Sequence, residues 1–492
     1  MELQIQKENI NIQKIIGGKS KRVVIEKDYI LPDSKPDIIK IQAENSLTYI
    51  RKKEIMENKV KIDGGIETRI AYITDEGKNR VLRIEDELSE TVEIEGISQE
   101  SNVTETISIT QISSTILNER KIHYKIEAEI QAKAFRKENI ELIHEINKIH
   151  NIETLNKKIR IDTYIGHSES KISVKEKLEI ENLQEKIEVI KFKPNIKNIE
   201  KKISYNKILV KADCQMKCIY QSESGSIYQC KKEVPIMGFL DIENVDEECE
   251  SNIEINLKNI SINESTVTQE LEIEMEFNLL GDVYQPKETN MIVDLYGINC
   301  KANCQRQMIS LEKNMPSICQ QIEVENKELI EDINQIYDQE YKIKEVTNKE
   351  NKIEIQIQAI FLYSSFENEN INKKEITINK EINSEYSLEN VQLKIRNEKT
   401  VLLPDANIQT NLEIIIQSNE TEKLNIINQI ELEDEENDDQ YSMIIYFVKE
   451  GDSLWKIAKR FKSTIKEISN INEIDDEKKI CAGEKLYIPR AI

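Results

Sequence analysis

Positive charge, aromatic side chains and chain-breaking residues are all scarce in this sequence. Of its 492 residues, 68 are Lys or Arg and 91 are Asp or Glu, which gives a formal charge of −23. Such a chain lacks the broad basic face that neutralises nucleic-acid phosphates, and an anionic membrane surface would repel it. We therefore expect neither nucleic acid nor an anionic membrane as a partner.

Long apolar runs are missing too. No run approaches the roughly 20 apolar residues of a membrane helix, so no membrane span is expected. The first residues, MELQIQKENINIQKII, show no basic stretch followed by an apolar one, which is the pattern of a secretory signal. The eight cysteines are scattered rather than forming the dense framework of a small secreted module. These features favour a reducing cytoplasm.

Signatures of catalysis and of metal binding are likewise absent. GGKS (17–20) has Gln13 where a phosphate-binding loop needs its first glycine. The cysteines at 214 and 218, and those at 300 and 304, would lie roughly 13 Å apart on a strand, too far to share a metal, and we expect buried thiols instead. The four histidines have no spaced Glu or Cys partners, and there is no G-x-S-x-G motif. We expect no catalytic residue, no metal and no cofactor, and hence not an enzyme.

What the chain does have is alternation of apolar and polar residues, with Ile the commonest apolar residue. It is clearest in residues 59–73, 91–97, 121–135, 252–262 and 271–279. A period of two places one set of side chains on a buried sheet face and the other in water, and β-branched Ile suits that surface. The sequence predicts a mainly β protein built of antiparallel, sandwich-like sheets.

The alternating region also repeats itself. A shift of 148 positions places residues 59–77 on 207–225 without a gap and pairs Tyr72 with Tyr220 and Gly77 with Gly225. A glycine after a polar tetrapeptide is what a hairpin turn with positive φ requires. A looser third copy carries Tyr363 in its first strand and has later strands in 375–382 and 411–418.

The segments 161–180 and 293–312 resemble each other around Asp-x-Tyr, which predicts that each copy includes a leading element before its main sheet. Seven of the ten residues 431–440 are acidic, and such a run repels itself and extends. The predicted units are an N-terminal segment (1–21), repeats at 22–150, 151–292 and 293–430, an acidic linker (431–441) and a C-terminal domain (442–492).

The C-terminal domain has the most specific pattern. YFV is a short strand, and Asp452 or Ser453 can then cap a helix. Its apolar residues, spaced i, i+3, i+4 and i+7, are Leu454, Ile457, Ala458 and Phe461. Thr464 can cap a second helix, and LYIP is a closing strand. The run GDSLWKIAKRF, the later Asn472 and GEKLYIP resemble the LysM domain.

That resemblance implies a βααβ fold with a groove for glycans that contain N-acetylglucosamine. The groove would lie between the loop after the first strand and the loop before the last. The matching residues are Gly451, Asp452, Ser453, Leu454, Ile480, Cys481, Ala482 and Gly483. Turn, cap and core roles for the first four residues remain open as the alternative.

The repeats resemble the SPOCS domain of sporulation proteins. The match rests on residues 22–50, with Pro-Asp at 32–33 and again at 36–37, followed by the long strand at 59–73. The order of SPOCS-like repeats, acidic linker and LysM domain resembles spore coat morphogenetic proteins of the SipL and SpoVID types. This implies a non-enzymatic assembly role at the forespore surface, on the mother-cell side, with the SpoIVA-like coat ATPase as the partner that the LysM domain docks.

Two other functions compete with this one. The chain could bind peptidoglycan of the wall or cortex through its LysM groove, or it could be a wall hydrolase, which the absence of a catalytic pattern disfavours. Residues 445–492 carry ten Lys or Arg against eight Asp or Glu, so this domain is mildly basic in an acidic chain. We expect Lys456 and Lys459 to form its partner-binding surface.

Overall fold

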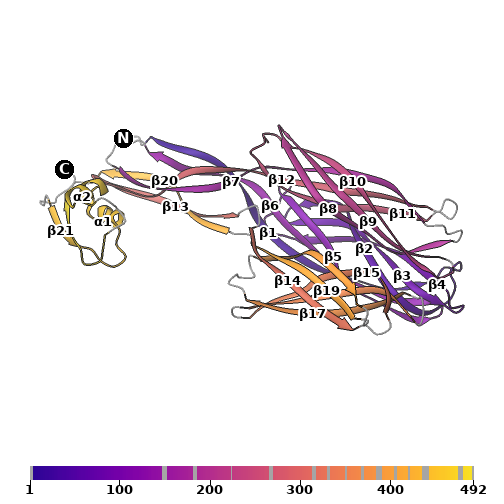
Figure 1. Ribbon diagram of the computed structural model, residues 1–492. Helices are drawn as coiled ribbons and strands as arrows, with labels where there is room; N and C mark the ends of the chain where they lie inside the picture. The colour runs from indigo at the N-terminus through magenta and orange to yellow at the C-terminus, as the bar shows by residue number, and fades with distance from the viewer. Residues whose placement is uncertain are drawn as a thin grey trace.

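The structure is a computed structural model, and strands make up nearly all of it. It describes residues 4–146, 152–180, 186–222, 224–264, 270–312, 317–329, 333–349, 352–366, 371–383, 391–403, 407–418, 421–434, 443–474 and 480–489. Figure 1 shows a body of strands, a narrow stalk that leaves it, and a small head with both helices.

The first repeat is a sandwich of two three-stranded antiparallel sheets. Its strands are β1 (Ile5–Ile30), β2 (Ile38–Met56), β3 (Lys59–Thr74), β4 (Asn79–Glu93), β5 (Asn102–Asn118) and β6 (Lys121–Ile146). One sheet has the order β1-β6-β5 and the other β2-β3-β4. Inward-facing side chains such as Ile62, Ile66, Ile126 and Ile130 form the core between them, as the alternation predicts.

The second repeat has the same topology. Its strands are β7 (Ile152–Glu179), β8 (Ile187–Ser204), β9 (Lys207–Ser222), β10 (Ile227–Asp241), β11 (Glu250–Glu264) and β12 (Glu270–Gly297), in sheets β7-β12-β11 and β8-β9-β10. Tyr72 and Tyr220 lie buried at matching places in β3 and β9. Gly77 and Gly225 follow with φ of +74° and +97°. The predicted duplication is confirmed.

The third repeat keeps the topology but divides its first and last strands. Its strands are β13 (Cys300–Glu312), β14 (Ser317–Leu329), β15 (Ile333–Lys349), β16 (Lys352–Ser365), β17 (Ile371–Asn383), β18 (Val391–Leu402), β19 (Asn407–Ser418) and β20 (Thr421–Asp434). The sheets are β15-β16-β17, β14-β19-β18 and the two-stranded β13-β20. Tyr363 sits two residues before the end of β16, as Tyr72 and Tyr220 do in β3 and β9.

Several boundaries expected from the sequence are wrong. β1 begins at Ile5 and crosses the boundary at residue 22, because its first half pairs with the far end of β6. β12 runs to Gly297, so Asp294 and Tyr296 end the second repeat instead of leading the third. Residues 431–434 of the expected linker belong to β20, where Leu432 joins an apolar cluster; residues 435–441 lie outside the described residues.

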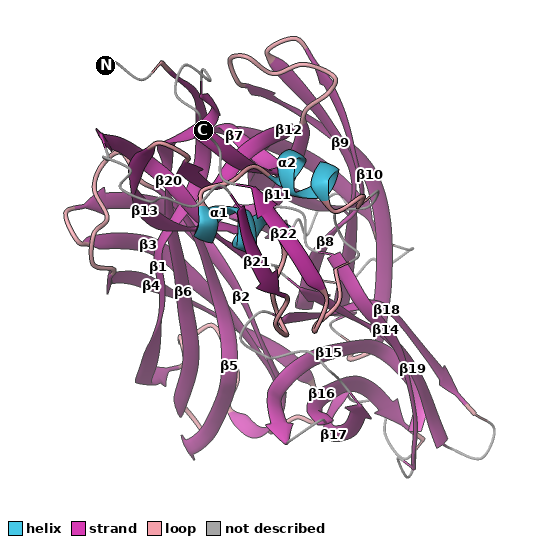
Figure 2. Cartoon of the chain, turned by 90° about the vertical axis from the view of Figure 1, so that its left-hand side faces the viewer, coloured by secondary structure: helices cyan, strands magenta, loops and turns pink. Residues whose placement is uncertain are grey.

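The three repeats close into a ring, seen end-on in Figure 2. Arg69 of the first repeat pairs with Glu264 of the second at 3.1 Å, and Lys191 of the second with Asp338 of the third at 2.8 Å. Lys373 of the third approaches Glu44 of the first at 3.9 Å. An apolar cluster with members from all three repeats includes Ala43, Ile190, Ile219, Tyr337 and Leu362. The body therefore has an approximate threefold arrangement, in which the three repeats of one chain occupy the places of three subunits.

The stalk consists of three two-stranded ribbons that continue from the sandwiches (Figure 1). They pair residues 5–15 with 135–146, 152–163 with 285–297, and β13 with β20. Apolar side chains from all three meet along its axis, namely Ile10, Ile12, Ile140, Leu142, Ile159, Ile161, Met291, Ile309, Leu424 and Ile426. The stalk thus has a core of its own.

The head comprises residues 443–489 and has the predicted βααβ order. Its elements are β21 (Met443–Phe447), α1 (Leu454–Phe461), α2 (Ile465–Ile471) and β22 (Lys485–Pro489). Ser453 caps α1, and Thr464 caps α2 in a reciprocal arrangement with Glu467. Leu454, Ile457, Ala458 and Ile468 are buried against β21 and β22.

Candidate functional site

The two predicted groove loops of the head lie next to each other. β21 leads into residues 451–454, and β22 begins just after 480–483. Backbone hydrogen bonds join the loops' bases: Gly483 N–H donates to the Val448 carbonyl at 2.8 Å, and Val448 N–H donates to the Glu484 carbonyl at 2.9 Å. The structure therefore brings the eight matched residues to one end of the head.

In the first loop, three of the four matched residues support the fold directly. The Asp452 carboxylate accepts from Lys449 N–H at 2.8 Å and from the Tyr446 hydroxyl at 2.7 Å, and these hydrogen bonds lower the pKa of Asp452. Ser453 caps α1 by accepting from Lys456 N–H at 3.3 Å, and Leu454 is buried. Gly451 is exposed, with φ of +81°.

The second loop is more open. Cys481, Ala482 and Gly483 are exposed and Ile480 is half-buried. Cys481 N–H donates to the Glu484 carboxylate at 2.9 Å, which closes the turn, and Gly483 has φ of +89°. A ligand that reached these loops would contact mainly Gly451 and residues 481–483.

The head rests on the tip of the stalk through one carboxylate, Asp294 at the end of β12. Asp294 accepts from the indole N–H of Trp455 at 2.8 Å and from Lys459 Nζ at 2.7 Å, both on α1. Arg306 of β13 donates to the same carboxylate at 2.7 Å. Burial alone would raise the pKa of Asp294, but Lys459, Trp455 and Arg306 hold it below its usual value.

An aromatic contact completes this head–stalk interface. The Tyr296 hydroxyl donates to the Ser463 carbonyl at 2.7 Å, and its ring centroid lies 5.0 Å from that of Trp455, edge to face. Tyr296 and Ile298 share one apolar cluster with the interior of the head. The head is thus packed against the stalk, whereas the sequence predicted only a tether.

The two lysines expected at a partner surface have different surroundings. Lys456 is exposed and donates from Nζ to the Gly451 carbonyl at 2.8 Å. Lys459 is engaged by Asp294 in the interface with the stalk. A partner-binding role for both lysines stays a prediction, although the charge of Lys459 is already paired within the chain.

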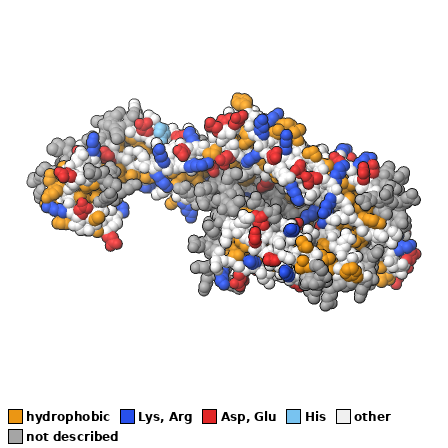
Figure 3. Space-filling model, in the orientation of Figure 1, with side chains coloured by type: hydrophobic (Ala, Val, Ile, Leu, Met, Phe, Trp, Pro, Cys, Tyr) orange, Lys and Arg blue, Asp and Glu red, His pale blue; other side chains and the backbone are white. Residues whose placement is uncertain are grey.

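The outer face of the head's two-stranded sheet carries an apolar patch that the sequence reasoning missed. Met443, Ile445 and Phe447 alternate along β21 with exposed fractions of 50%, 54% and 60%, and Tyr487 of β22, opposite Ile445, is 38% exposed. Figure 3 shows apolar side chains on the head surface. The alternation in MIIYF could have revealed this face, and the Asp-x-Tyr motif could have drawn attention to Asp294 and Tyr296.

Of the four cysteines that the sequence predicted to be buried thiols, two are buried and two are half-buried. Cys214 and Cys218 lie in the core of the second repeat, and burial raises the pKa of the Cys214 thiol to about 11. Cys300 and Cys304 are half-buried on β13. Among the described residues, no cluster of three or more His, Cys, Asp or Glu could hold a metal ion.

Comparison with known proteins identifies two kinds of domain. Residues 446–489 match the LysM domain, and residues 37–117 and 185–264 match the family described as SipL, SPOCS domain. The two SPOCS matches cover β2–β5 and β8–β11, so both resemblances found in the sequence are confirmed. No curated protein and no solved structure matches the chain. Within the described residues, no helix has the length and hydropathy to cross a membrane.

Proposed function

We propose that this sporulation-related chain, with its two SPOCS domains and its LysM domain of the peptidoglycan-binding type, is a non-enzymatic assembly protein of the spore coat. Its head docks the coat ATPase at the forespore surface, from the mother-cell cytoplasm. The stalk holds the head away from the body, and the body supplies a large surface for further coat proteins.

The observation that carries this proposal is the exposed apolar face of β21 and β22 at the tip of the stalk. Met443, Ile445, Phe447 and Tyr487 gather on one side of a two-stranded sheet in a chain of charge −23. Exposed clusters of large apolar side chains are typical of protein-binding surfaces, where aromatic anchors contribute most of the affinity. A glycan groove does not require this face, because the two loops lie at the end of the sheet.

The test is co-purification of the full chain with the coat ATPase. The double change Ile445→Thr and Phe447→Thr places β-branched residues at both positions of the strand but removes the apolar anchors, and we expect at least a tenfold loss of capture. The matched control is Met237→Thr with Met308→Thr, which removes two exposed apolar side chains elsewhere. Equal capture by both double variants would rule out docking through this face.

The adjacency of the two head loops favours peptidoglycan binding as a second candidate function. Ala482 is exposed in the second loop, so Ala482→Trp would obstruct the groove without disturbing the core. Peptidoglycan and N-acetylglucosamine oligomers should then be bound less well, whereas capture of the ATPase should persist. Tight sugar binding by the natural chain without any capture of the ATPase would overturn the docking proposal in favour of this function.

A further inference from the structure

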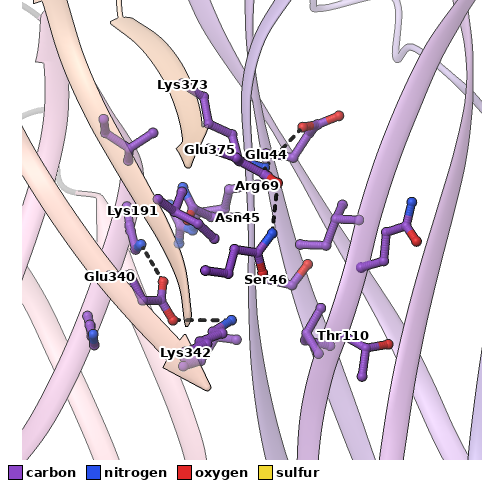
Figure 4. Close-up of a pocket in the computed structure, with 18 of the residues that line it drawn as sticks. Glu44, Asn45, Ser46, Arg69, Thr110, Lys191, Glu340, Lys342, Lys373 and Glu375 are labelled. Atoms are coloured by element: carbon purple, nitrogen blue, oxygen red, sulfur yellow. Dashed lines mark hydrogen bonds and ion pairs between the residues drawn. The ribbon is translucent and has the colours of Figure 1, made fainter. Parts of the chain in front are cut away.

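A polar cavity of about 490 Å³ lies inside the ring of repeats. Its lining comes from all three: β2, β3 and β5 of the first, β8 of the second, and β15, β16 and β17 of the third (Figure 4). A volume of this size is typical of small-molecule sites. The cavity is distant in sequence and in space from the head, so its role is independent of the docking proposed above.

Cationic side chains outnumber acidic ones on the cavity wall. The cations are Arg69, Lys191, Lys193, Lys342, Lys344 and Lys373, and the carboxylates are Glu44, Glu67, Glu340 and Glu375. The chain as a whole carries a charge of −23, so the excess of cations on the cavity wall is opposite in sign to the net charge of the chain. A concave, positively lined site concentrates anions.

The carboxylates on the wall are also shared between cations. Glu340 pairs with Lys191 at 3.0 Å and with Lys342 at 3.2 Å. Glu67 pairs with Arg69 at 2.7 Å and with Arg83 at 2.8 Å. Arg69 also pairs with Glu264 and Lys191 also pairs with Asp338, two carboxylates outside the wall. Lys193 and Lys344 form no ion pair among the described residues, so the positive balance of the wall comes from these two lysines.

Two buried donors on the wall lack an acceptor within the described part of the chain. Arg69 is 4% exposed; its Nε binds Glu67 and its Nη1 binds the Val189 carbonyl, but Nη2 is buried without a hydrogen bond. Asn45 lies directly opposite Arg69 in the β2–β3 pairing, and its Nδ2 is also buried without a hydrogen bond. Buried donors in native proteins usually have partners, so neighbouring orphan N–H groups indicate a missing acceptor.

We propose that this cavity binds a small multivalent oxyanion, a phosphate ester or a polycarboxylate. Its oxygens accept hydrogen bonds from Arg69 Nη2 and Asn45 Nδ2, and the ammonium groups of Lys193 and Lys344 balance its remaining charge. Because the wall comes from three repeats, such a ligand stabilises the closed ring and raises the melting temperature further as its concentration rises above its dissociation constant.

The test measures thermal unfolding and calorimetric binding of the full chain with pyrophosphate, citrate and inorganic phosphate, each against sodium chloride at equal ionic strength. We expect saturable binding and a higher melting temperature with pyrophosphate or citrate. A preference for pyrophosphate identifies phosphate esters, and a preference for citrate identifies polycarboxylates. Lys193→Gln with Lys344→Gln should weaken binding at least tenfold.

The matched control is Lys374→Gln with Lys394→Gln, which makes the same change of charge at exposed lysines that do not line the cavity. It should bind as the natural chain does. Arg69→Lys should keep the charge and lose affinity, because the ammonium cannot supply the Nη2 donor.

Two results would overturn the proposal: no stabilisation beyond that of chloride, or an equal loss of binding in the control variant. Capture of the coat ATPase is not used as a readout, so failure here leaves the docking proposal intact.

Discussion

His167 shows how a single buried side chain can make this body sensitive to pH. Its Nδ1 lies 3.1 Å from Asp282 and its Nε2 lies 3.2 Å from Glu169, which in turn pairs with Lys53 of the first repeat at 2.6 Å. Burial alone would lower the pKa of His167, but the two carboxylates raise it to about 9. The imidazolium thus links β7 and β12 and supports the contact with the first repeat.

A histidine whose folded pKa exceeds its unfolded value of about 6.5 contributes stability that is complete below that pH. This contribution is lost as the pH rises through about 9. We expect the urea midpoint of the natural chain to fall between pH 6.5 and pH 9.5, and to fall less in His167→Gln. Parallel pH profiles for the two chains would show that His167 carries no linked stability.

Gly77 and Gly225 test the turns that the sequence alone identified. Both have positive φ, where a β-branched residue is strained, so Gly77→Val and Gly225→Val should each cost about 1 kcal/mol or more of unfolding free energy. Gly77→Asn should cost less, because Asn tolerates this conformation. Chemical denaturation measures all three. A Val variant as stable as the Asn variant would contradict the turn argument.

The turn glycines, the paired tyrosines and the buried cysteines could be predicted because each depends on local pattern. The orphan donor of Arg69, the carboxylate of Asp294 and the pairing of Lys459 could not. Each of these arises where elements more than a hundred residues apart in the sequence meet. Alternation says which face a side chain occupies but not which element it faces.

At the scale of elements, the head folds around its own core but part of that core is covered by residues of the stalk. Its helices and strands close a core, yet Tyr296 of β12 and Ile298, which follows β12, belong to the same apolar cluster. A fragment of residues 441–492 should therefore melt cooperatively, but at a lower temperature than the head does within the full chain. Reductant should not change this melt, since the fragment has one cysteine, Cys481. A broad or absent transition would show that the head needs the stalk to fold.

Docking of the head can be followed through Trp455, the single tryptophan of the chain. Asp294→Ala removes the acceptor for its indole N–H and for Lys459, so we expect red-shifted emission and easier quenching by acrylamide. Glu433→Ala removes an exposed stalk carboxylate paired with Lys301 and serves as the control. Unchanged emission in Asp294→Ala would mean that Tyr296 alone holds the head.

The strand content, the repeats and the βααβ head could be read from period and spacing, but strand length could not. β12 has 28 residues, where about five or six are usual, because its second half serves the stalk and not the sandwich. Both halves alternate, so nothing local marks the place where one role ends. The acidic run is ambiguous in the same way, because part of it is a strand and not a linker. Glu433 of β20 pairs with Lys301 and Asn303 of the neighbouring strand β13.

At the scale of the whole molecule, the ring of repeats depends on buried charge pairs. Asp338 of the third repeat accepts from both Lys191 and Lys217 of the second. Burial would raise the pKa of Asp338, but the two lysines lower it. Asp338→Asn removes the ion-pair partner of Lys217 and leaves Lys191 with Glu340 alone, so it should cost about 3 kcal/mol.

Glu381→Gln is the control for this change, because it breaks an exposed pair with Lys352 in the same repeat and should cost less than about 1 kcal/mol. Circular dichroism during urea unfolding gives both values. Since Asp338 lies between repeats, the loss should appear in the single transition of the whole body. A loss confined to one repeat would show that the ring does not unfold as a unit.

The unbroken course of β12 from the body to the head gives the stalk a mechanical character. A pull on the head is transmitted through Tyr296 and Asp294 directly into β12, which is paired along its length with β7. The load then runs parallel to the strands, so that many cross-strand hydrogen bonds share it at once instead of opening one after another. If the head is bound to a surface that shrinks or swells, the resulting tension would reach the ring of repeats without separating β12 from β7.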